Sequence, residues 1–137
     1  MKKKIVRGLR NNNPGNIRIN SDVFQGEITP SKDKSFKQFR SMAYGYRAIF
    51  RILYTYKRAY KLDTIQQWIS KWAPPEDNND TVSYIGLVCR YCGMSASNVI
   101  DIANKELMCE IVAGISKQEN GVEPDMSEIE AGWRLSR

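Results

Sequence analysis

The stretch of sequence that most constrains the fold runs from Asn104 to Gly121 and reads NKELMCEIVAGISKQENG. Its apolar residues recur at steps of three and four positions, a period that predicts a helix with one face in a core. These residues are Leu107, Met108, Ile111, Val112 and Ile115. Asn120-Gly121 then supplies a stop, because both residues tolerate the left-handed backbone found after a helix C-terminus.

Glu119 is the last acidic side chain of this predicted helix, and it lies four residues after Ile115, so it continues the apolar stripe. A carboxylate at that position is expected to be partly desolvated and to face the negative end of the helix dipole, and both effects favour its protonated form. A protonated carboxyl group near neutral pH is what a general acid needs, so Glu119 is the leading catalytic candidate. The alternative is that Glu119 projects into water from a frayed last turn.

The chain has 137 residues, the size of one domain with a sizeable core, and we expect residues 1–137 to form a single domain. No apolar run approaches the length of a transmembrane helix, and the first ten residues are too broken by basic side chains to form a signal-peptide core. Synthesis in the cytoplasm and a soluble product are therefore expected.

The three cysteines, Cys89, Cys92 and Cys109, form an odd set in a chain without histidine. This composition is typical of reduced thiols. A zinc or redox site at Cys89 and Cys92 is the alternative, but both residues share a helical face with apolar neighbours, and a tetrahedral site would lack a ligand. We therefore expect core cysteines and neither metal nor cofactor.

The formal net charge is +6, which favours an anionic partner such as nucleic acid, an acidic cell wall or a membrane surface. Apart from Lys2–Lys4, the basic residues are scattered along the sequence, as is typical of a solvated face, and no nucleic-acid motif accompanies them.

The N-terminal part contains turns and short alternating segments. Arg7–Asn16 is a run of turn formers, in which Pro14-Gly15 suits the centre of a type II turn. The asparagines before that turn either cap it or present hydrogen bonds to a polar ligand. Alternation over 17–39 predicts a small, irregular antiparallel sheet, with Ile17–Ile19 pairing with Val23–Ile28 and a further strand at Phe36–Phe39.

Helical signals fill the rest of the chain, which makes the predicted class α+β, mainly α, with about five to six helices. Ser41 caps a long helix that runs to about Tyr60, and a capping box at Asp63 and Gln66 opens another helix that reaches Trp72. The remaining segments are a loop over Ala73–Asp80, a helix over Thr81–Cys92, a short turn or helix over Asn98–Ala103, the helix ending at Glu119, and a helix opened by a capping box at Ser127 and Glu130.

Together these segments resemble a family of phage-associated virion and lysis proteins. The more specific parts of the resemblance are NNNPGNI at Asn11–Ile17, and WAPP at Trp72–Pro75 followed by Asn78 and Tyr84. Weaker parts are Phe24-Gln25-Gly26, Phe36 with Phe39, Gly45 with Arg47-Ala48, and Glu119-Asn120-Gly121.

The order of the segments is also similar to a circularly permuted form of the lysozyme-like fold shared by lytic transglycosylases and bacterial glucosaminidases. In those families the helix that ends in the catalytic Glu precedes the β region and the long helix, whereas here it follows them. The resemblance implies that Glu119 is the catalytic acid and Tyr84 a tyrosine of the cleft. It places contacts to sugar on Asn12, Asn13 and Asn16.

Trp72 and Tyr84 offer aromatic faces for stacking on sugar rings. For a second catalytic carboxylate the resemblance offers Glu27 in the β segment, with a solvated strand residue as the alternative interpretation. Asp22 and Asp33 are weaker competitors.

The expected function is cleavage of the aminosugar backbone of bacterial peptidoglycan, by hydrolysis or as a lytic transglycosylase, with Glu119 as general acid. A non-catalytic virion or cell-wall-binding protein with the same fold is the first alternative, and it predicts wall binding that is independent of Glu119. A nucleic-acid-binding module ranks well behind, and it predicts affinity that falls steeply with salt. Expected partners are glycan strands and other virion proteins, without membrane insertion. Delivery to the wall would then need the virion or a separate factor.

Overall fold

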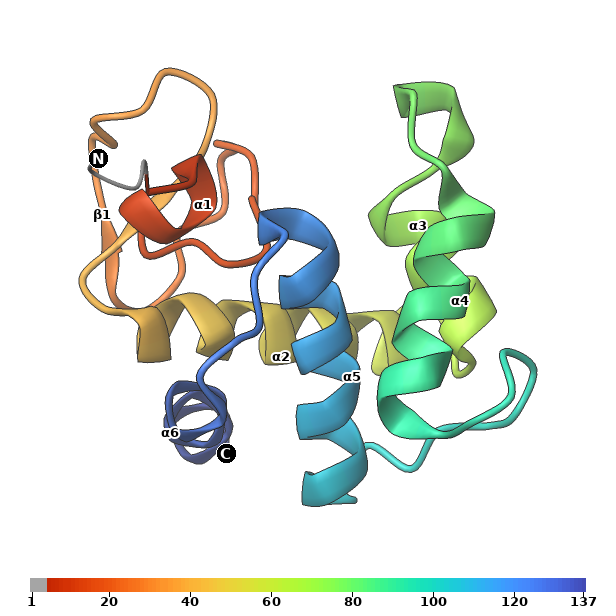
Figure 1. Ribbon diagram of the computed structural model, residues 1–137. Coiled ribbons are helices and arrows are strands. Elements are labelled where there is room, and N and C mark those ends of the chain that lie inside the picture. The colour runs from red at the N-terminus through yellow and green to blue at the C-terminus, as the bar shows by residue number, and fades with distance from the viewer. Residues whose placement is uncertain (1–4) are drawn as a thin grey trace.

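The computed structural model of the chain describes residues 5–137 and is mainly helical, with a small two-stranded antiparallel sheet (Figure 1). This confirms the α+β, mainly α, class. Lys2–Lys4 lie outside the described residues. The elements are α1 (Arg7–Arg10), β1 (Glu27–Ile28), β2 (Gln38–Phe39), α2 (Met42–Arg58), α3 (Ile65–Trp72), the 3₁₀ helix η1 (Pro75–Asp77), α4 (Thr81–Cys92), α5 (Lys105–Asn120) and α6 (Met126–Ser136). Within residues 5–137, no helix combines the length and the apolar character needed to cross a membrane.

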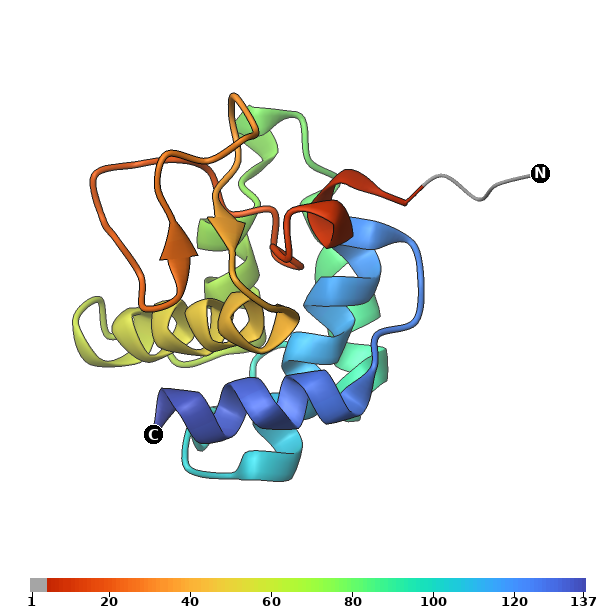
Figure 2. The ribbon, with the colours of Figure 1, turned by 90° about the vertical axis from the view of Figure 1, so that its left-hand side faces the viewer.

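Helix α2 is the platform of the fold. Ser41 caps it as predicted, since its hydroxyl accepts a hydrogen bond from the backbone N–H of Tyr44 at 3.4 Å. One face of α2 is buried among α5 and α6, and α6 crosses α2 on the side away from the strands (Figure 2). Gly132 permits the close crossing, because a Cβ there would lie 2.6 Å from Cβ of Tyr46. The ring of Trp133 then packs edge-on against that of Phe50, with centroids 5.5 Å apart.

Helix α5 carries the apolar stripe predicted for it. Its buried residues include Met108, Ile111, Val112 and Ile115. Asn104 caps the N-terminus, and Gly121 ends the helix in the left-handed conformation, with φ of 73°. Figure 1 shows the C-terminal end of α5 rising between the N-terminal region and the α3–α4 pair. The carboxyl end of this helix therefore lies where three parts of the chain meet.

The small sheet differs from its predicted pairing. Arg18 bridges to Phe36, and the backbone N–H of Ile19 donates to the carbonyl of Ser35 at 2.9 Å, so Ile17–Ile19 runs beside 35–37 instead of beside 23–28. Residues 24–27 cannot extend as a strand, because Glu27 N–H bonds back to the carbonyl of Phe24 in a tight turn. Only Glu27–Ile28 remains in strand form, paired antiparallel with Gln38–Phe39.

The turn at 13–16 is closed by a hydrogen bond from Asn16 N–H to the carbonyl of Asn13 at 3.0 Å, but it is not of type II. Positive φ angles fall on Asn12 (52°) and Asn16 (48°), and not on Gly15. Gly15 is required for space, because a Cβ there would lie 2.9 Å from the ring of Trp72 and 3.0 Å from Ile49. Asparagine adopts the left-handed region more readily than most residues, so Asn12 and Asn16 can carry these positive φ angles.

Two helix caps lie beside the predicted capping boxes. Helix α3 is capped by Thr64, whose hydroxyl accepts from Gln67 N–H at 3.2 Å, and not by Asp63. Helix α6 is capped by Asp125 and not by Ser127. In both cases a residue one or two positions earlier or later in the sequence, also of a type that favours N-caps, takes the cap position. Helix α1 arises in the run of predicted turn formers, and 98–103 forms turns.

Candidate active site

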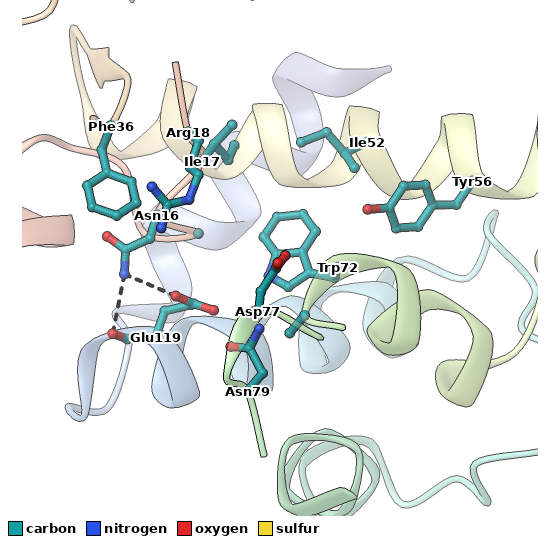
Figure 3. A pocket seen from close by; sticks show the side chains of 12 residues that line it. Asn16, Ile17, Arg18, Phe36, Ile52, Tyr56, Trp72, Asp77, Asn79 and Glu119 are labelled. Atoms are coloured by element: carbon teal, nitrogen blue, oxygen red, sulfur yellow. Dashed lines mark hydrogen bonds between the residues drawn. The ribbon is translucent and has the colours of Figure 1, made fainter. Parts of the chain in front are cut away.

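The C-terminal end of α5 presents Glu119 to an open pocket of about 380 Å³ (Figure 3). One wall comes from the turn after α1 and from the β region, and the opposite wall comes from the end of α3 and the η1 loop. The lining residues are Gly15, Asn16, Ile17, Arg18, Phe36, Ile52, Tyr56, Trp72, Ala73, Asp77, Asn79 and Glu119. Segments far apart in sequence thus form one site.

Asn16 holds one side of the Glu119 carboxyl group. Its amide Nδ2 donates to Oε1 of Glu119 at 3.0 Å and to the backbone carbonyl of the same residue at 3.4 Å. The left-handed backbone of Asn16 turns its side chain toward α5. The turn and the helix are also joined directly, because the amide of Asn120 donates to the carbonyl of Pro14 at 2.9 Å. The position of Asn16 opposite Glu119 is therefore fixed by two independent links.

Helix α1 closes the back of this junction. A Cβ at Gly8 would collide with Oδ1 of Asn120 and would lie 2.8 Å from Oδ1 of Asn16. That Asn120 oxygen is buried and has no hydrogen-bond partner among the described residues. It faces the backbone of Gly8, where a weak Cα–H contact is the available interaction. Glycine at this position lets α1 pack directly behind the pocket.

Tyr84, from α4, holds the other side of the carboxyl group. Its hydroxyl donates to Oε2 of Glu119 at 2.9 Å, and the side chain is only 3% exposed. Burial and the negative charge of Glu119 raise the pKa of Tyr84 well above its usual value. The hydroxyl therefore keeps its proton and acts as a donor. Tyr84 orients Glu119 and offers no open face to a sugar, contrary to the stacking role considered for it.

Trp72 lines the pocket, and its half-buried indole faces the space in front of Glu119 (Figure 3). On the opposite wall, the guanidinium of Arg18 lies over the ring of Phe36, 5.1 Å from its centroid. Ile52 and Tyr56 continue the lining along α2. The site thus combines one oriented carboxyl group with aromatic and cationic surfaces, a combination that suits a polar ligand with flat apolar faces, such as a sugar.

Asn12 and Asn13 do not line this pocket. The amide of Asn13 donates to the carbonyls of Ile17 and Lys37, both at 2.9 Å, and its Oδ1 accepts from Ile17 N–H. Asn12 donates to the carbonyl of Phe39 at 3.2 Å. Asn13 thus closes the turn, Asn12 joins it to β2, and Asn16 faces the pocket. The sugar contacts that the resemblance implies for Asn12 and Asn13 stay a prediction, and in this structure both amides are bonded within the fold.

Glu27 is neither solvated nor in the pocket with Glu119. Its side chain is 4% exposed, both carboxylate oxygens accept from Nζ of Lys37 at 3.1 Å, and Oε1 also accepts from Phe24 N–H. Lys37 is itself fully buried. In this structure Glu27 therefore forms a buried ion pair within the fold, apart from the residues that line the pocket with Glu119. Asp33 is likewise engaged elsewhere, bound by Arg7 at 2.6 Å.

Asp77 and Asn79 are pocket residues that sequence reasoning missed. Both belong to the loop after Trp72, which was recognised as a loop because of its prolines. The signal that could have identified them is the cluster of acidic and amide side chains placed directly after a predicted pocket tryptophan. Asp77 supplies the second carboxylate of the pocket. Within residues 5–137, no three side chains of the metal-binding types gather closely enough to hold a metal ion.

No family model matches the chain. It is similar to Protein P5 of Pseudoalteromonas phage PM2, with 37% identity over 132 residues. The alignment covers 93% of this chain and 80% of that protein, so it spans the turn at 13–16, the loop after α3 and the end of α5.

Proposed function

Since the chain belongs to the family of Protein P5 of Pseudoalteromonas phage PM2, we propose that this phage protein cleaves bacterial peptidoglycan. The reaction is cleavage of the aminosugar backbone, by hydrolysis or by lytic transglycosylation, on a lysozyme-like fold in permuted order. One observation carries the proposal: the carboxyl group of Glu119 is oriented by Asn16 and Tyr84 at the wall of an open pocket with aromatic sides.

In the first step Glu119 donates its proton to the glycosidic oxygen while an oxocarbenium-like state develops on the sugar. Asn16 and Tyr84 touch the carboxyl group from two directions, which keeps it aimed at one place. Trp72 and the Phe36 wall hold the neighbouring rings by their apolar faces. Contacts to the neighbouring rings thus hold the glycosidic oxygen close to the Glu119 carboxyl group.

The second step depends on what attacks the sugar. Asp77 shares the pocket with Glu119 and takes the place that the sequence suggested for Glu27. If Asp77 activates a water molecule, that water attacks the sugar and the glycosidic bond is hydrolysed. If the sugar's own hydroxyl group attacks, with Glu119 now acting as base, an anhydro-sugar forms, as in lytic transglycosylases. The mass of the product distinguishes the two courses by one water.

The test compares wild type with Glu119→Gln on purified peptidoglycan, by loss of turbidity and by mass spectrometry of released fragments. Glu130→Gln is the matched control, since it removes an exposed carboxylate on α6. We expect Glu119→Gln to lower the rate by about 10²- to 10⁴-fold, the usual contribution of a general acid, while the control keeps full rate. Equal rates in all three proteins would overturn the role of Glu119.

A non-catalytic virion or wall-binding protein is the second candidate. It is favoured by the fact that both side chains bound to the Glu119 carboxyl group, Asn16 and Tyr84, are uncharged and serve equally well in a binding pocket. If wild type and Glu119→Gln both sediment with peptidoglycan and release nothing, this candidate replaces the enzyme. In either case we place the protein in the virion or at the wall after release by a separate factor.

A further inference from the structure

A second pocket, of about 560 Å³, continues the first along α2. The two pockets share Ile17, Ile52 and Tyr56, so they are adjacent. Figure 3 shows Ile52 and Tyr56 following one another along α2 away from Glu119. The far walls of the second pocket come from the loop 20–25 and from the end of α3. A chain bound beside Glu119 therefore has room to continue into it.

Three cationic side chains line this second pocket. Arg47 and Arg51 lie one turn apart on α2, and Lys71 comes from α3. Among the described residues, none of the three forms an ion pair with a carboxylate. Asp22 is the acidic residue in the lining, and it comes from the loop. The pocket thus gathers positive charge that the protein itself leaves largely uncompensated.

The guanidinium groups of Arg47 and Arg51 are each fixed by a hydrogen bond to a backbone carbonyl. Nε of Arg47 donates to the carbonyl of Leu135 at 3.2 Å, and Nη1 of Arg51 donates to that of Ser136 at 3.2 Å, both at the C-terminal end of α6. Each guanidinium has five N–H donors, so most remain for a ligand. Burial and the nearby charge of Arg51 lower the pKa of Arg47, as expected where cations crowd together. An anion between them would relieve that repulsion.

The same pocket also has apolar surface. The ammonium group of Lys71 lies over the ring of Tyr60, 4.2 Å from its centroid, and Tyr60 is 56% exposed. Val23, on the facing loop, is 71% exposed. Exposed apolar side chains beside fixed cations suit a short peptide that carries carboxylates.

We propose that this second pocket, which we call the basic pocket, binds the carboxylates of the peptide stem attached to the glycan in the first pocket. The inference rests on the proposed function, because it takes the glycan as the ligand beside Glu119. Peptidoglycan carries short acidic peptides on alternate sugars, so a glycan bound at Glu119 brings a stem to one side of the scissile bond. A nucleic acid would instead need an extended row of cations, whereas three cationic side chains gather in this pocket.

The experiment measures binding by calorimetry in the Glu119→Gln background, where the ligand is not consumed. Two ligands are compared: a tetrasaccharide of peptidoglycan with its peptide stems, and the same glycan after the stems are removed by an amidase. We expect the stem-bearing glycan to bind more tightly. Arg51→Gln and Lys71→Gln should each weaken its binding roughly fivefold, as for an ion pair near the surface, and leave the stripped glycan unchanged.

Matched controls are Arg90→Gln on α4 and Lys105→Gln on α5, which are exposed and remove the same charge outside both pockets. They should leave both ligands unaffected. Arg51→Lys, which keeps the charge, should restore part of the lost affinity, whereas a merely structural role of the guanidinium at Ser136 would not be rescued.

The outcomes separate this inference from the proposed function. If both glycans bind alike in every protein while wild type still cleaves the stripped glycan, the basic pocket has no role and the enzyme stands. If nothing is cleaved but Arg51 and Lys71 still control binding of the stem-bearing glycan, the pocket stands and the enzyme fails. If duplex DNA displaces the glycan and its affinity follows Arg51 and Lys71, the occupant is nucleic acid and the inference is overturned.

Discussion

The hydroxyl of Tyr84 donates a hydrogen bond of 2.9 Å to Oε2 of Glu119, while the amide of Asn16 donates to Oε1 of the same carboxyl group at 3.0 Å. One donor is a buried side chain of α4, and the other belongs to a residue with a left-handed backbone at the end of the turn. The carboxyl group is therefore held between two parts of the chain that are fixed by different interactions. This arrangement allows each contact to be tested separately.

Tyr84→Phe removes one of these hydrogen bonds and keeps the packing. We expect kcat on peptidoglycan to fall about tenfold with little change in KM, because this bond orients the proposed acid. A hydrogen bond between neutral partners contributes roughly 0.5–1.5 kcal/mol, and about 1.4 kcal/mol corresponds to a tenfold change in rate. Tyr46→Phe is the matched control, since it removes another buried hydroxyl, bonded to Ser116 at 2.9 Å outside the pocket. If both variants lost activity equally, Tyr84 would be important for stability alone.

Asn16 has two separable roles, one in the backbone and one at Glu119. Asn16→Gly keeps the left-handed conformation and removes the amide, whereas Asn16→Ala removes the amide and strains the backbone by roughly 1–2 kcal/mol. We expect both variants to lose activity to a similar degree, and the alanine variant to unfold at lower denaturant concentration. Urea titration followed by circular dichroism measures the second effect. An active glycine variant would show that the amide is dispensable.

Glu27 and Lys37 form a buried ion pair, and breaking it from one side should be costly. Lys37→Met leaves the Glu27 carboxylate buried without its cation, which we expect to lower the free energy of unfolding by about 3–5 kcal/mol. The double variant Lys37→Met with Glu27→Gln should recover part of that loss, because the uncompensated charge is gone. Denaturant unfolding of wild type, Lys37→Met, Glu27→Gln and the double variant measures this coupling.

The same substitution separates structure from catalysis at Glu27. At a temperature where Glu27→Gln is fully folded, we expect its rate on peptidoglycan to match that of wild type. A loss of 10²-fold or more in a folded protein, the size expected of a catalytic carboxylate, would return Glu27 to the reaction.

Asp33 should make the free energy of unfolding depend on pH in the acidic range. Hydrogen bonds from Arg7, from the backbone of Ser35 and from Asn11 hold the pKa of Asp33 well below its usual range. A depressed pKa in the folded protein means that the stabilisation is fully present above about pH 4, the ordinary pKa of aspartate, and is lost as the pH falls below it. The urea midpoint of wild type should therefore exceed that of Asp33→Asn by a constant amount between pH 5 and pH 7. A gap that persisted unchanged to pH 2.5 would contradict this assignment.

Much of the helical framework could be predicted because its signals are local. The three-and-four spacing in α5, the Ser41 cap of α2 and the span Thr81–Cys92 all follow from residues close in sequence. The sheet could not be predicted in detail, because the partner of Ile17–Ile19 depends on the turn at 24–27, which is set by contacts of Glu27 within the fold. Strands of two residues also give almost no periodic signal.

The candidate site, like the fold, could be predicted only in part. The helix end at Glu119 and the pocket tryptophan Trp72 were accessible from pattern and resemblance. Among the asparagines, however, the residue type is the same at positions 12, 13 and 16, and only the backbone geometry decides which amide faces the pocket. Asp77 could not be predicted for a similar reason, since the sequence of a loop with many polar residues does not indicate which of them faces the pocket.

The link between Asn16 and Glu119 joins residues 103 positions apart. During synthesis on the ribosome the chain emerges from its N-terminus, so the turn that holds Asn16 is made long before the helix that carries Glu119. The carboxyl group and both of its donors can meet only after α5 has left the ribosome. Nascent chains that end before α5 therefore carry no assembled site.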